Sequence, residues 1–266
     1  MKVNDPIGVF DSGIGGLTVV RALMARLPFE NIIYFGDTAR VPYGVKSVAT
    51  IELYARQIAE FLLQHEVKML IVACNTMAAV AHRAIVDLSP VPVLDVIDAG
   101  ARAAAAVTYT KRVGVIGTPA TINSGAYHRA IHKFDPEIRI TSQTCPLFVP
   151  LVEEGWLEHP ATYLIAEEYL KPVLAHNLDT LVLGCTHYPL LKPLLQHIVG
   201  DKIRLVDSAE AMADQTAAML DQQGLGNPES SPPAYRYYVT DVPYRFQSIG
   251  EVFLGRALGD VQVVKW

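Results

Sequence analysis

The chain has 266 residues, of which 51% are hydrophobic and 18% are charged, and its formal net charge at pH 7 is −5. This length fits two domains of ordinary size or one large domain, and the apolar content excludes a globally disordered chain. Nucleic-acid-binding surfaces carry clustered Lys and Arg residues, and this acidic sequence contains no such cluster. We therefore expect no direct binding of nucleic acid.

The features of an exported or membrane-bound protein are also missing from the sequence. No uninterrupted apolar stretch approaches the ~18 residues of a membrane span, and the polar opening MKVNDP leads directly into a strand pattern. The three cysteines, Cys74, Cys145 and Cys185, form neither a CxxC pair nor an even disulfide framework. We therefore expect free thiols in a reducing compartment, the cytoplasm.

Short apolar runs alternate with longer amphipathic runs in the first part of the chain. This pattern is typical of strand–helix–strand units and a mostly parallel sheet. Pro28 ends the first helical run, and Asn75 or Thr76 is the expected N-cap of the third. The expected strands are residues 7–10, 31–35, 69–73 and 91–96, and the expected helices are residues 17–27, 47–64 and the run from the cap to residue 84.

The same pattern begins again in the second part of the chain. The segment IGVFDSG at residues 7–13 resembles VGVIGTP at 113–119, and LIVACNT at 70–76 resembles LVLGCTH at 181–187. A repeat of this kind indicates two α/β halves that are built alike.

The C-terminal region is expected to return to the first half. The segment QGLGNPESSPP at residues 223–233 is the most linker-like stretch, and the strand-like segments YRYYVTD and VQVVKW follow it. We therefore predict an α/β fold with two pseudo-symmetric open parallel-sheet domains that face each other across the active site. The first domain comprises residues 1–97 plus about 208–266, and the second comprises about 98–207.

Polar and nucleophilic side chains follow four of the predicted strands. In open parallel sheets, functional groups gather beyond the carboxyl ends of the strands, where loops and helix N-termini converge. Two halves that face each other would enclose one small site with a thiol on each side. The side chains concerned are Asp11, Ser12, Cys74, Asn75, Thr76, Thr118, Cys185, Thr186 and His187.

Two thiols at helix N-termini suit a particular reaction on a small anion. Unpaired backbone N–H groups and the helix dipole lower the pKa of a thiol there, and the same N–H groups can hold carboxylates. Inverting a stereocentre next to a carboxylate needs a base on one face and an acid on the other, and a thiolate and a thiol can exchange these roles. The neighbouring Asp11 and His187 can set which thiol carries the proton.

Each of these residues also has a structural interpretation. A buried cysteine after an apolar strand is commonly a core residue, and we place Cys145 in the core because it has no matching partner. Asp11 and Ser12 can cap the next helix, and His187 can be a turn residue. Cys185 and His187 lack a further ligand cluster, so we expect no metal. The GIGG segment after Ser12 lacks the third glycine of a dinucleotide site and predicts a tight turn.

Five segments taken together resemble the glutamate racemases of the cofactor-independent aspartate/glutamate racemase family. They keep the order known in that family and span most of residues 7–191. These segments are FDSGIGGLTV at 10–19, GDTARVPYG at 36–44, ACNTMA at 73–78, GVIGTPATI at 114–122 and LGCTHYPLL at 183–191.

The resemblance implies interconversion of L- and D-glutamate without a cofactor, supplying D-glutamate for peptidoglycan, cell-wall biogenesis and cell shape. It assigns the acid/base roles to two thiols. Cys74, with Asp11 close by, would act on D-glutamate, and Cys185, with His187 close by, would act on L-glutamate. Family members are commonly homodimers, so we expect a homodimer. Members that need a peptidoglycan precursor as activator tend to have an extended N-terminus, so we expect activity without one here.

The resemblance also implies which residues contact the substrate. Asp37 in GDTARVPYG and Glu153 in PLVEEGW match acidic positions that the family places near the site. Both also have a structural interpretation, as a loop-capping residue and a solvated helix charge. The implied substrate contacts are Ser12, Tyr43, Gly44, Asn75, Thr76, Thr118 and Thr186.

Three other functions compete with this interpretation. An aspartate racemase of similar build differs in substrate by one methylene, which a pocket discriminates by only ~1–3 kcal/mol. A Cys–His hydrolase or transferase would use one thiol as the nucleophile, so that Cys74→Ser would keep most activity and Cys185→Ser would abolish it. A two-lobed binding protein for a small amino acid would explain the anion-holding strand ends, although it leaves the pairing of the thiols unexplained.

Overall fold

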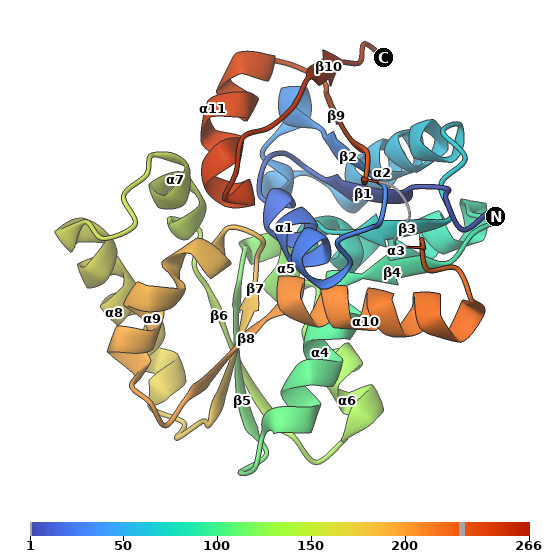
Figure 1. Cartoon of the computed structure of the whole chain (residues 1–266). Helices are drawn as coiled ribbons and strands as arrows, with labels where there is room; N and C mark the ends of the chain where they lie inside the picture. The colour runs from blue at the N-terminus through green and yellow to red at the C-terminus, as the bar shows by residue number, and fades with distance from the viewer. Residues whose placement is uncertain (1, 229–231) are drawn as a thin grey trace.

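The computed structural model describes residues 2–228 and 232–266 and has an α/β fold with two parallel sheets (Figure 1). Among the described residues, the first sheet has the strand order β10-β9-β2-β1-β3-β4, and every neighbouring pair is parallel. Its strands are β1 (Ile7–Asp11), β2 (Ile32–Gly36), β3 (Met69–Val72), β4 (Val93–Asp95), β9 (Tyr235–Val239) and β10 (Val261–Val263).

The second sheet repeats this construction on a smaller scale. Its strand order is β6-β5-β7-β8, and its neighbouring strands are again parallel. Both sheets place β-strands of the repeated sequence segments at their centre, β1 and β3 in the first and β5 and β7 in the second. The second-sheet strands are β5 (Arg112–Gly117), β6 (Arg139–Thr144), β7 (Thr180–Gly184) and β8 (Arg204–Asp207).

Helices cover the sheets, and long helices lie where the two sheets meet (Figure 1). Helix α10 packs against both α1 and α4, which joins the two halves along one side. The helices are α1 (Leu17–Arg26), α2 (Val48–Leu63), α3 (Asn75–Leu88), α4 (Val96–Val107), α5 (Pro119–Asn123), α6 (Ala126–Phe134), α7 (Phe148–Glu153), α8 (Pro160–Leu174), α9 (Lys192–Val199), α10 (Ser208–Gln223) and α11 (Pro243–Leu254), with short 3-10 turns η1 (Thr38–Arg40), η2 (Tyr43–Val45) and η3 (Tyr188–Leu191).

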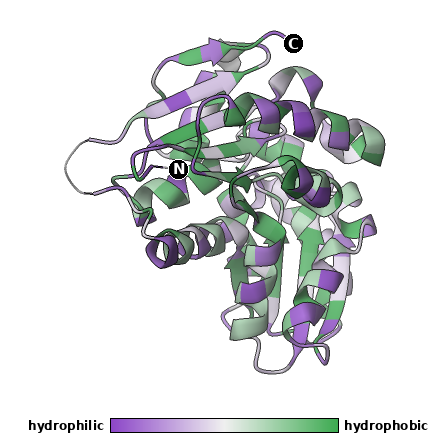
Figure 2. Cartoon of the chain, turned by 90° about the vertical axis from the view of Figure 1, so that its right-hand side faces the viewer, coloured by the Kyte–Doolittle hydropathy of each residue, from purple (hydrophilic) through white to green (hydrophobic). Residues whose placement is uncertain are grey.

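The central strands are largely apolar because both of their faces are covered. All residues of β1, β2, β3 and β7 are buried. Parallel strands that are buried on both faces have continuous apolar sequences instead of alternating ones. Figure 2 shows hydrophobic residues in the strands and hydrophilic residues on the outer turns of the helices.

The predicted strands and helices of the first half are confirmed, with changes at their ends. The predicted cap of the third helix is wrong by one position, because Cys74 is the N-cap residue and has no side-chain cap hydrogen bond. That helix also continues beyond residue 84 to Leu88, where Ser89 and Pro90 stop it. The C-terminal region adds two strands to the first sheet, since β9 pairs with β2 and β10 pairs with β9.

The division between the domains follows from the membership of the two sheets. The last strand of the first half, β4, ends at Asp95, and the last strand of the second sheet, β8, ends at Asp207. We propose the division that the sequence predicted, with residues 1–97 plus about 208–266 as one domain and about 98–207 as the other. The predicted linker begins as α10 ends at Gln223, but its residues 229–231 lie outside the described residues.

A buried ion pair joins three segments at the amino ends of the first-sheet strands. Lys68 Nζ lies 2.5 Å from Glu30 Oε2, and the two side chains are 0% and 3% exposed. Lys68 Nζ also donates hydrogen bonds to the carbonyl oxygens of Val3 and Leu225, at 2.7 and 2.8 Å. The pair therefore ties the N-terminal segment and the segment after α10 to the sheet.

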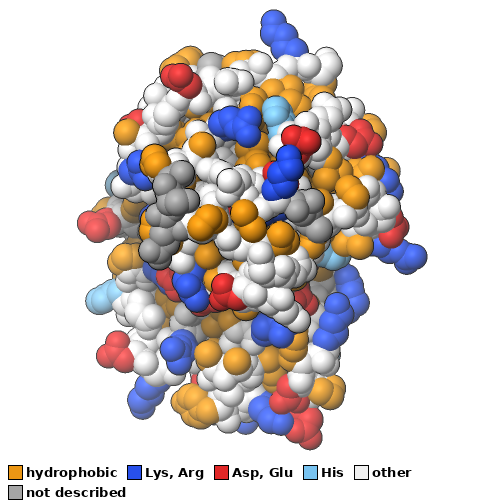
Figure 3. All heavy atoms as spheres, turned by 45° about the vertical axis from the view of Figure 1, so that its right-hand side comes forward, with side chains coloured by type: hydrophobic (Ala, Val, Ile, Leu, Met, Phe, Trp, Pro, Cys, Tyr) orange, Lys and Arg blue, Asp and Glu red, His pale blue; other side chains and the backbone are white. Residues whose placement is uncertain are grey.

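The surface and the helices show two further features. On the face in Figure 3, Lys and Arg side chains are interspersed with Asp and Glu side chains and do not gather in one basic patch. Across the part of the chain that the structure describes, no helix has the length and apolar character needed to cross a membrane.

Candidate active site

The polar strand ends of the two sheets line one shared cavity of about 470 Å³. Its walls come from the loops after β1, β2 and β3 of the first sheet and after β5, β6 and β7 of the second. Eleven of the thirteen residues expected from the sequence line it; Asp11 and Asp37 do not. Those eleven are Ser12, Tyr43, Gly44, Cys74, Asn75, Thr76, Thr118, Glu153, Cys185, Thr186 and His187.

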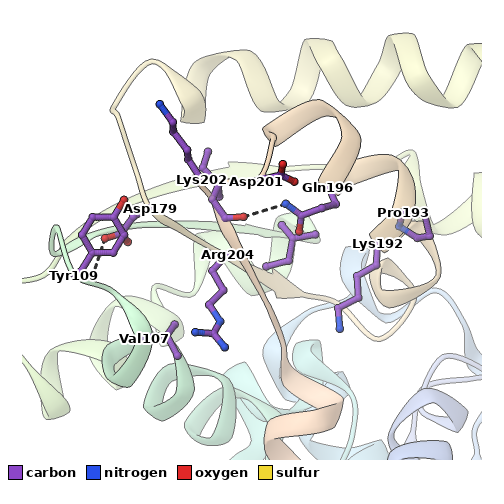
Figure 4. A pocket seen from close by; sticks show the side chains of 11 residues that line it. Val107, Tyr109, Asp179, Lys192, Pro193, Gln196, Asp201, Lys202 and Arg204 are labelled. Carbon is purple, nitrogen blue, oxygen red and sulfur yellow. Dashed lines mark hydrogen bonds between the residues drawn. The ribbon is translucent and has the colours of Figure 1, made fainter.

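A larger hollow, of about 760 Å³, lies around β8 and α9 of the second domain. Figure 4 shows that its charged side chains do not converge, since Lys192 and Lys202 extend away from each other. Lys192 also forms ion pairs with Asp207 and Glu210, at 3.3 and 2.7 Å. The shared cavity is therefore the better candidate for a site of chemistry.

Cys74 lies two residues after the end of β3 and is the N-cap residue of α3. Its Sγ lies 3.5 Å from Ser12 Oγ, and the residue is 5% exposed. Burial and the nearby Asp11 carboxylate raise the pKa of this thiol to about 12, although hydrogen bonds from Ser12 and the backbone N–H of Met77 act in the opposite direction. The expected lowering of the Cys74 pKa is therefore wrong, because burial and a neighbouring negative charge outweigh the helix N-terminus.

Asp11 lies at the end of β1 and does not line the cavity. Its Oδ2 accepts hydrogen bonds from the backbone N–H groups of Gly13 and Gly16, each at 3.1 Å, which stabilises the turn before α1. Its Oδ1 is buried and has no hydrogen-bond partner among the described residues. The carboxylate acts on Cys74 through its charge, as the raised pKa of that thiol indicates.

Cys185 has a different set of neighbours. It follows β7, and its Sγ lies 3.9 Å from Nδ1 of His187, whose Nε2 lies 3.0 Å from Oε1 of Glu153 in α7. Burial lowers the pKa of His187, but hydrogen bonds and charges from Cys185 and Glu153 outweigh it and raise the pKa to about 10. His187 is therefore an imidazolium at neutral pH, with Nδ1 towards the sulfur of Cys185 and Nε2 towards Glu153. Glu153 is thus more than a solvated helix charge.

Hydroxyl and amide groups line the cavity together with the two thiols. Asn75 Oδ1 accepts a hydrogen bond from Tyr127 Oη at 2.7 Å, which leaves the buried Nδ2 without a hydrogen-bond partner among the described residues. The hydroxyls of Thr76 and Thr118 lie 3.2 Å apart across the two sheets. These donors lie beside the N-termini of α3 and α5, where a carboxylate would be favoured.

Asp37 supports the cavity wall from behind. It is fully buried, its carboxylate accepts a hydrogen bond from the Tyr43 hydroxyl, and its Oδ1 also accepts from Arg40 Nε at 3.0 Å and from Thr240 Oγ1 at 2.9 Å. The guanidinium of Arg40 lies over the rings of Tyr54 and of Trp266. Asp37 therefore holds Tyr43 in place from one layer behind the cavity wall and does not line the cavity itself.

Sequence patterns did not identify the apolar wall of the cavity. These residues lie in loops and in the short helices α5 and α7, which are too short to show periodicity, so nothing in the sequence separated them from ordinary surface positions. Tyr127 of α6, which orients Asn75, was missed for another reason, because its partner is far away in sequence. The apolar wall consists of Ile14, Val41, Pro42, Val45, Pro119, Pro146, Val149 and Pro150.

Gly15 was expected only to form a tight turn, but it also permits a close approach between the domains. A Cβ atom at this position would lie 2.2 Å from Thr186 Oγ1 and 2.6 Å from Cε1 and Nδ1 of His187. Only glycine fits here without displacing the side chains of Thr186 and His187, which flank Cys185. Cys145 is buried and has a free thiol, as expected, and among the described residues no His, Cys, Asp and Glu side chains gather as a possible metal site.

Comparison with known proteins identifies the family. The family model described as Asp/Glu/Hydantoin racemase matches residues 15–216. Glutamate racemase from Syntrophus aciditrophicus is 73% identical over 260 residues, covering 98% of this chain and 96% of that protein. Glutamate racemase from Neisseria meningitidis serogroup A is 59% identical over 260 residues, covering 97% of this chain and 96% of that protein.

A solved structure agrees with this result. The crystal structure of glutamate racemase from Francisella tularensis in complex with D-glutamate superposes with a TM-score of 0.92 at 46% identity, covering 99% of this chain and 98% of that chain. The two-sheet α/β protein described above is therefore an isomerase, an amino-acid racemase. It belongs to the Asp/Glu/Hydantoin racemase family.

Proposed function

We propose that this racemase interconverts L- and D-glutamate by transferring the α-proton between two thiols. The observation that carries the proposal is the pair of cysteines. Cys74 comes from the first sheet and Cys185 from the second, each just after a central strand, and both line the same cavity. Glutamate as the substrate is supported by close relatives that are named glutamate racemase and by the relative whose structure contains D-glutamate.

The two thiols have different surroundings. Cys74 is a thiol at neutral pH because burial and Asp11 raise its pKa to about 12. Cys185 instead faces His187, whose Nδ1 lies 3.9 Å from the sulfur. In the proposed cycle on L-glutamate, Cys185 acts as the base and Cys74 as the acid.

The proton balance of the reaction follows from these states. The Cys185 thiolate removes the α-proton of L-glutamate, and the electron pair of the C–H bond remains on the α-carbon. The Cys74 thiol then delivers its proton to the opposite face, which gives D-glutamate, a Cys74 thiolate and a Cys185 thiol. The reverse reaction begins from this second state. Cys74 is therefore the base for D-glutamate and Cys185 the base for L-glutamate.

The groups between the thiols would hold the substrate and its transition state. Ser12, Thr118 and Thr186, with the free amide Nδ2 of Asn75 and the backbone N–H groups of nearby helix N-termini, supply donors for the carboxylates. Donors that are already in place also stabilise the charge that develops on the substrate α-carboxylate as the α-proton leaves. Tyr43 and Gly44 close the first-domain side of the cavity, and Thr76 adds a hydroxyl.

The family likeness supports a wider role for the reaction. We propose that the enzyme supplies D-glutamate for peptidoglycan, and thereby serves cell-wall biogenesis and cell shape, in the cytoplasm and as a homodimer. Glutamate is the only partner that the mechanism requires, and no step of the mechanism uses a cofactor.

The proposal is tested with glutamate and aspartate and with matched cysteine variants. Purified protein should racemise both glutamate isomers, measured by polarimetry, and should act much more slowly on aspartate. Cys74→Ser and Cys185→Ser should each abolish racemisation, while Cys145→Ser, the matched control outside the cavity, should keep it. Racemisation of aspartate alone would overturn the assignment of glutamate as the substrate. Racemisation that survives Cys74→Ser would overturn the two-thiol mechanism, and saturable binding without turnover would favour a binding protein.

A further inference from the structure

His187 lies at the contact between the two domains. The ring of Phe253, in α11 of the first domain, meets the His187 ring edge-on, with centroids 5.1 Å apart and planes at 81°. Phe253 is fully buried, and His187 is 7% exposed. The second-domain imidazole is therefore enclosed on one side by its own domain, through Cys185 and Glu153, and on another side by an aromatic ring of the first domain.

A second contact joins the same loop to the first domain. Thr18, in the first turn of α1, uses its hydroxyl to donate to the carbonyl oxygen of Thr186 at 3.1 Å and to that of Gly15 at 2.9 Å. Thr18 is 1% exposed, so this hydrogen bond is shielded from water. The backbone of the loop after β7 is thus fixed by α1, while its imidazole is fixed by α11.

The contacts with Phe253 and Thr18 hold His187 and its loop from the side of the first domain. The hydrogen bonds to Cys185 and Glu153 hold the imidazole at its two nitrogens, and both partners belong to the second domain. Phe253 adds an edge-to-face contact from the first domain, an arrangement that stabilises aromatic pairs beyond simple burial. A ring that rotates or shifts would lose the alignment of Nδ1 with the sulfur.

We propose that Phe253 and Thr18 are positioning residues through which the first domain aligns His187 with Cys185. This inference rests on the proposed two-thiol racemisation and deepens it. Cys74 needs no such help, because its neighbours Asp11 and Ser12 belong to the same sheet. Proton transfer at Cys185 therefore depends on the contact between the domains, whereas proton transfer at Cys74 does not.

The test must separate the two proton transfers. Enantiomers are equally stable, so any variant lowers kcat/KM equally in both directions, and kcat/KM alone cannot distinguish the thiols. Primary isotope effects on kcat/KM can distinguish the two thiols. The α-deuterium of labelled L-glutamate is transferred to Cys185, and the α-deuterium of labelled D-glutamate is transferred to Cys74. If proton transfer at Cys185 is slowed, that step becomes more rate-limiting. The isotope effect with labelled L-glutamate then increases, and the isotope effect with labelled D-glutamate decreases.

The variant to make is Phe253→Leu, with Phe246→Leu as the matched control. Phe246 is a buried phenylalanine in the same helix, 2% exposed, and it stacks on Tyr34 at 6.0 Å. We expect Phe253→Leu to lower kcat/KM by roughly tenfold, as a shift of a fraction of an ångström would, and to change the isotope effects in opposite directions. Phe246→Leu should lower the Tm by a similar amount and leave the two isotope effects in their wild-type ratio.

A second variant protects the test against failure to fold. Thr18→Val removes the hydrogen bond to Thr186 while keeping the shape, and Thr18→Ser restores the hydroxyl. We expect Thr18→Val to increase the isotope effect with L-glutamate and to decrease the isotope effect with D-glutamate. Thr18→Ser should restore both isotope effects to their wild-type values. Isotope effects that keep their wild-type ratio in Phe253→Leu, or in Thr18→Val if the first variant does not fold, would overturn the proposal. Wild-type protein that fails to racemise glutamate would instead overturn the proposed function itself.

Discussion

Replacing Gly15 with alanine should damage catalysis through a contact between the domains. The added Cβ would lie 2.2 Å from Thr186 Oγ1 and 2.6 Å from two ring atoms of His187, whereas ordinary contact begins at 3.4 Å. The side chains of Thr186 and His187, or the loop that carries them, must therefore move by about 1 Å. Misplacing catalytic groups by this distance costs on the order of 100-fold in rate, and overpacking a buried site costs about 1–3 kcal/mol of stability.

The assay combines polarimetry of glutamate racemisation with thermal unfolding. Gly259→Ala is the matched control, because its added Cβ would meet nothing within 4 Å, so its kcat/KM and Tm should equal those of the wild type. We expect Gly15→Ala to lower kcat/KM by roughly 100-fold while the protein remains folded at the assay temperature. Near wild-type kcat/KM in a folded Gly15→Ala variant would refute the reasoning, because the loop would then tolerate the displacement that the geometry demands.

Three further substitutions test other parts of the structure. Asp11→Asn removes a negative charge beside Cys74, so the pKa of that thiol should fall below its value of about 12. The pKa is measured by titrating the thiolate absorbance in protein whose other two cysteines are replaced by serine. An unchanged pKa would contradict the effect of the Asp11 charge on Cys74. Lys68→Met leaves the Glu30 carboxylate buried without its cation and should lower the free energy of unfolding by about 3–5 kcal/mol in a urea titration, with partial recovery when Glu30→Gln is added. Asp37→Asn weakens charge-assisted hydrogen bonds behind the cavity wall and should raise KM for glutamate by roughly tenfold with a smaller change in kcat, and an unchanged KM would show that the wall does not depend on them.

Much of the fold could be predicted because its strands are buried on both faces. Sequences such as those of β1, β3 and β7 are continuous apolar runs, and the repeat in the sequence corresponds to equivalent strands of two sheets. The same repeat indicated the pair of Cys74 and Cys185, since each follows a strand at an equivalent place. Local patterns also explain the errors at helix ends, where one or two residues decide the cap.

The rest of the site depends on contacts between distant parts of the chain. The raised pKa of Cys74 results from burial beside Asp11, which no local pattern reveals. The position of Asp37 behind the cavity is set by Thr240, a residue of the returning C-terminal region. The contact of Phe253 with His187 likewise joins the returning helix to the second domain. Such contacts are known only once the two domains are placed together.

The most direct test of the two-thiol account is the position of deuterium early in the reaction. L-glutamate is incubated with the enzyme in D2O, and both isomers are separated and analysed by mass after a small fraction has reacted. The account predicts deuterium at the α-carbon of the D-glutamate formed and almost none in the recovered L-glutamate, because Cys185 removes the proton and Cys74 delivers a solvent-derived one. Deuterium entering the recovered L-glutamate as fast as D-glutamate forms, or D-glutamate that keeps the original proton, would contradict it.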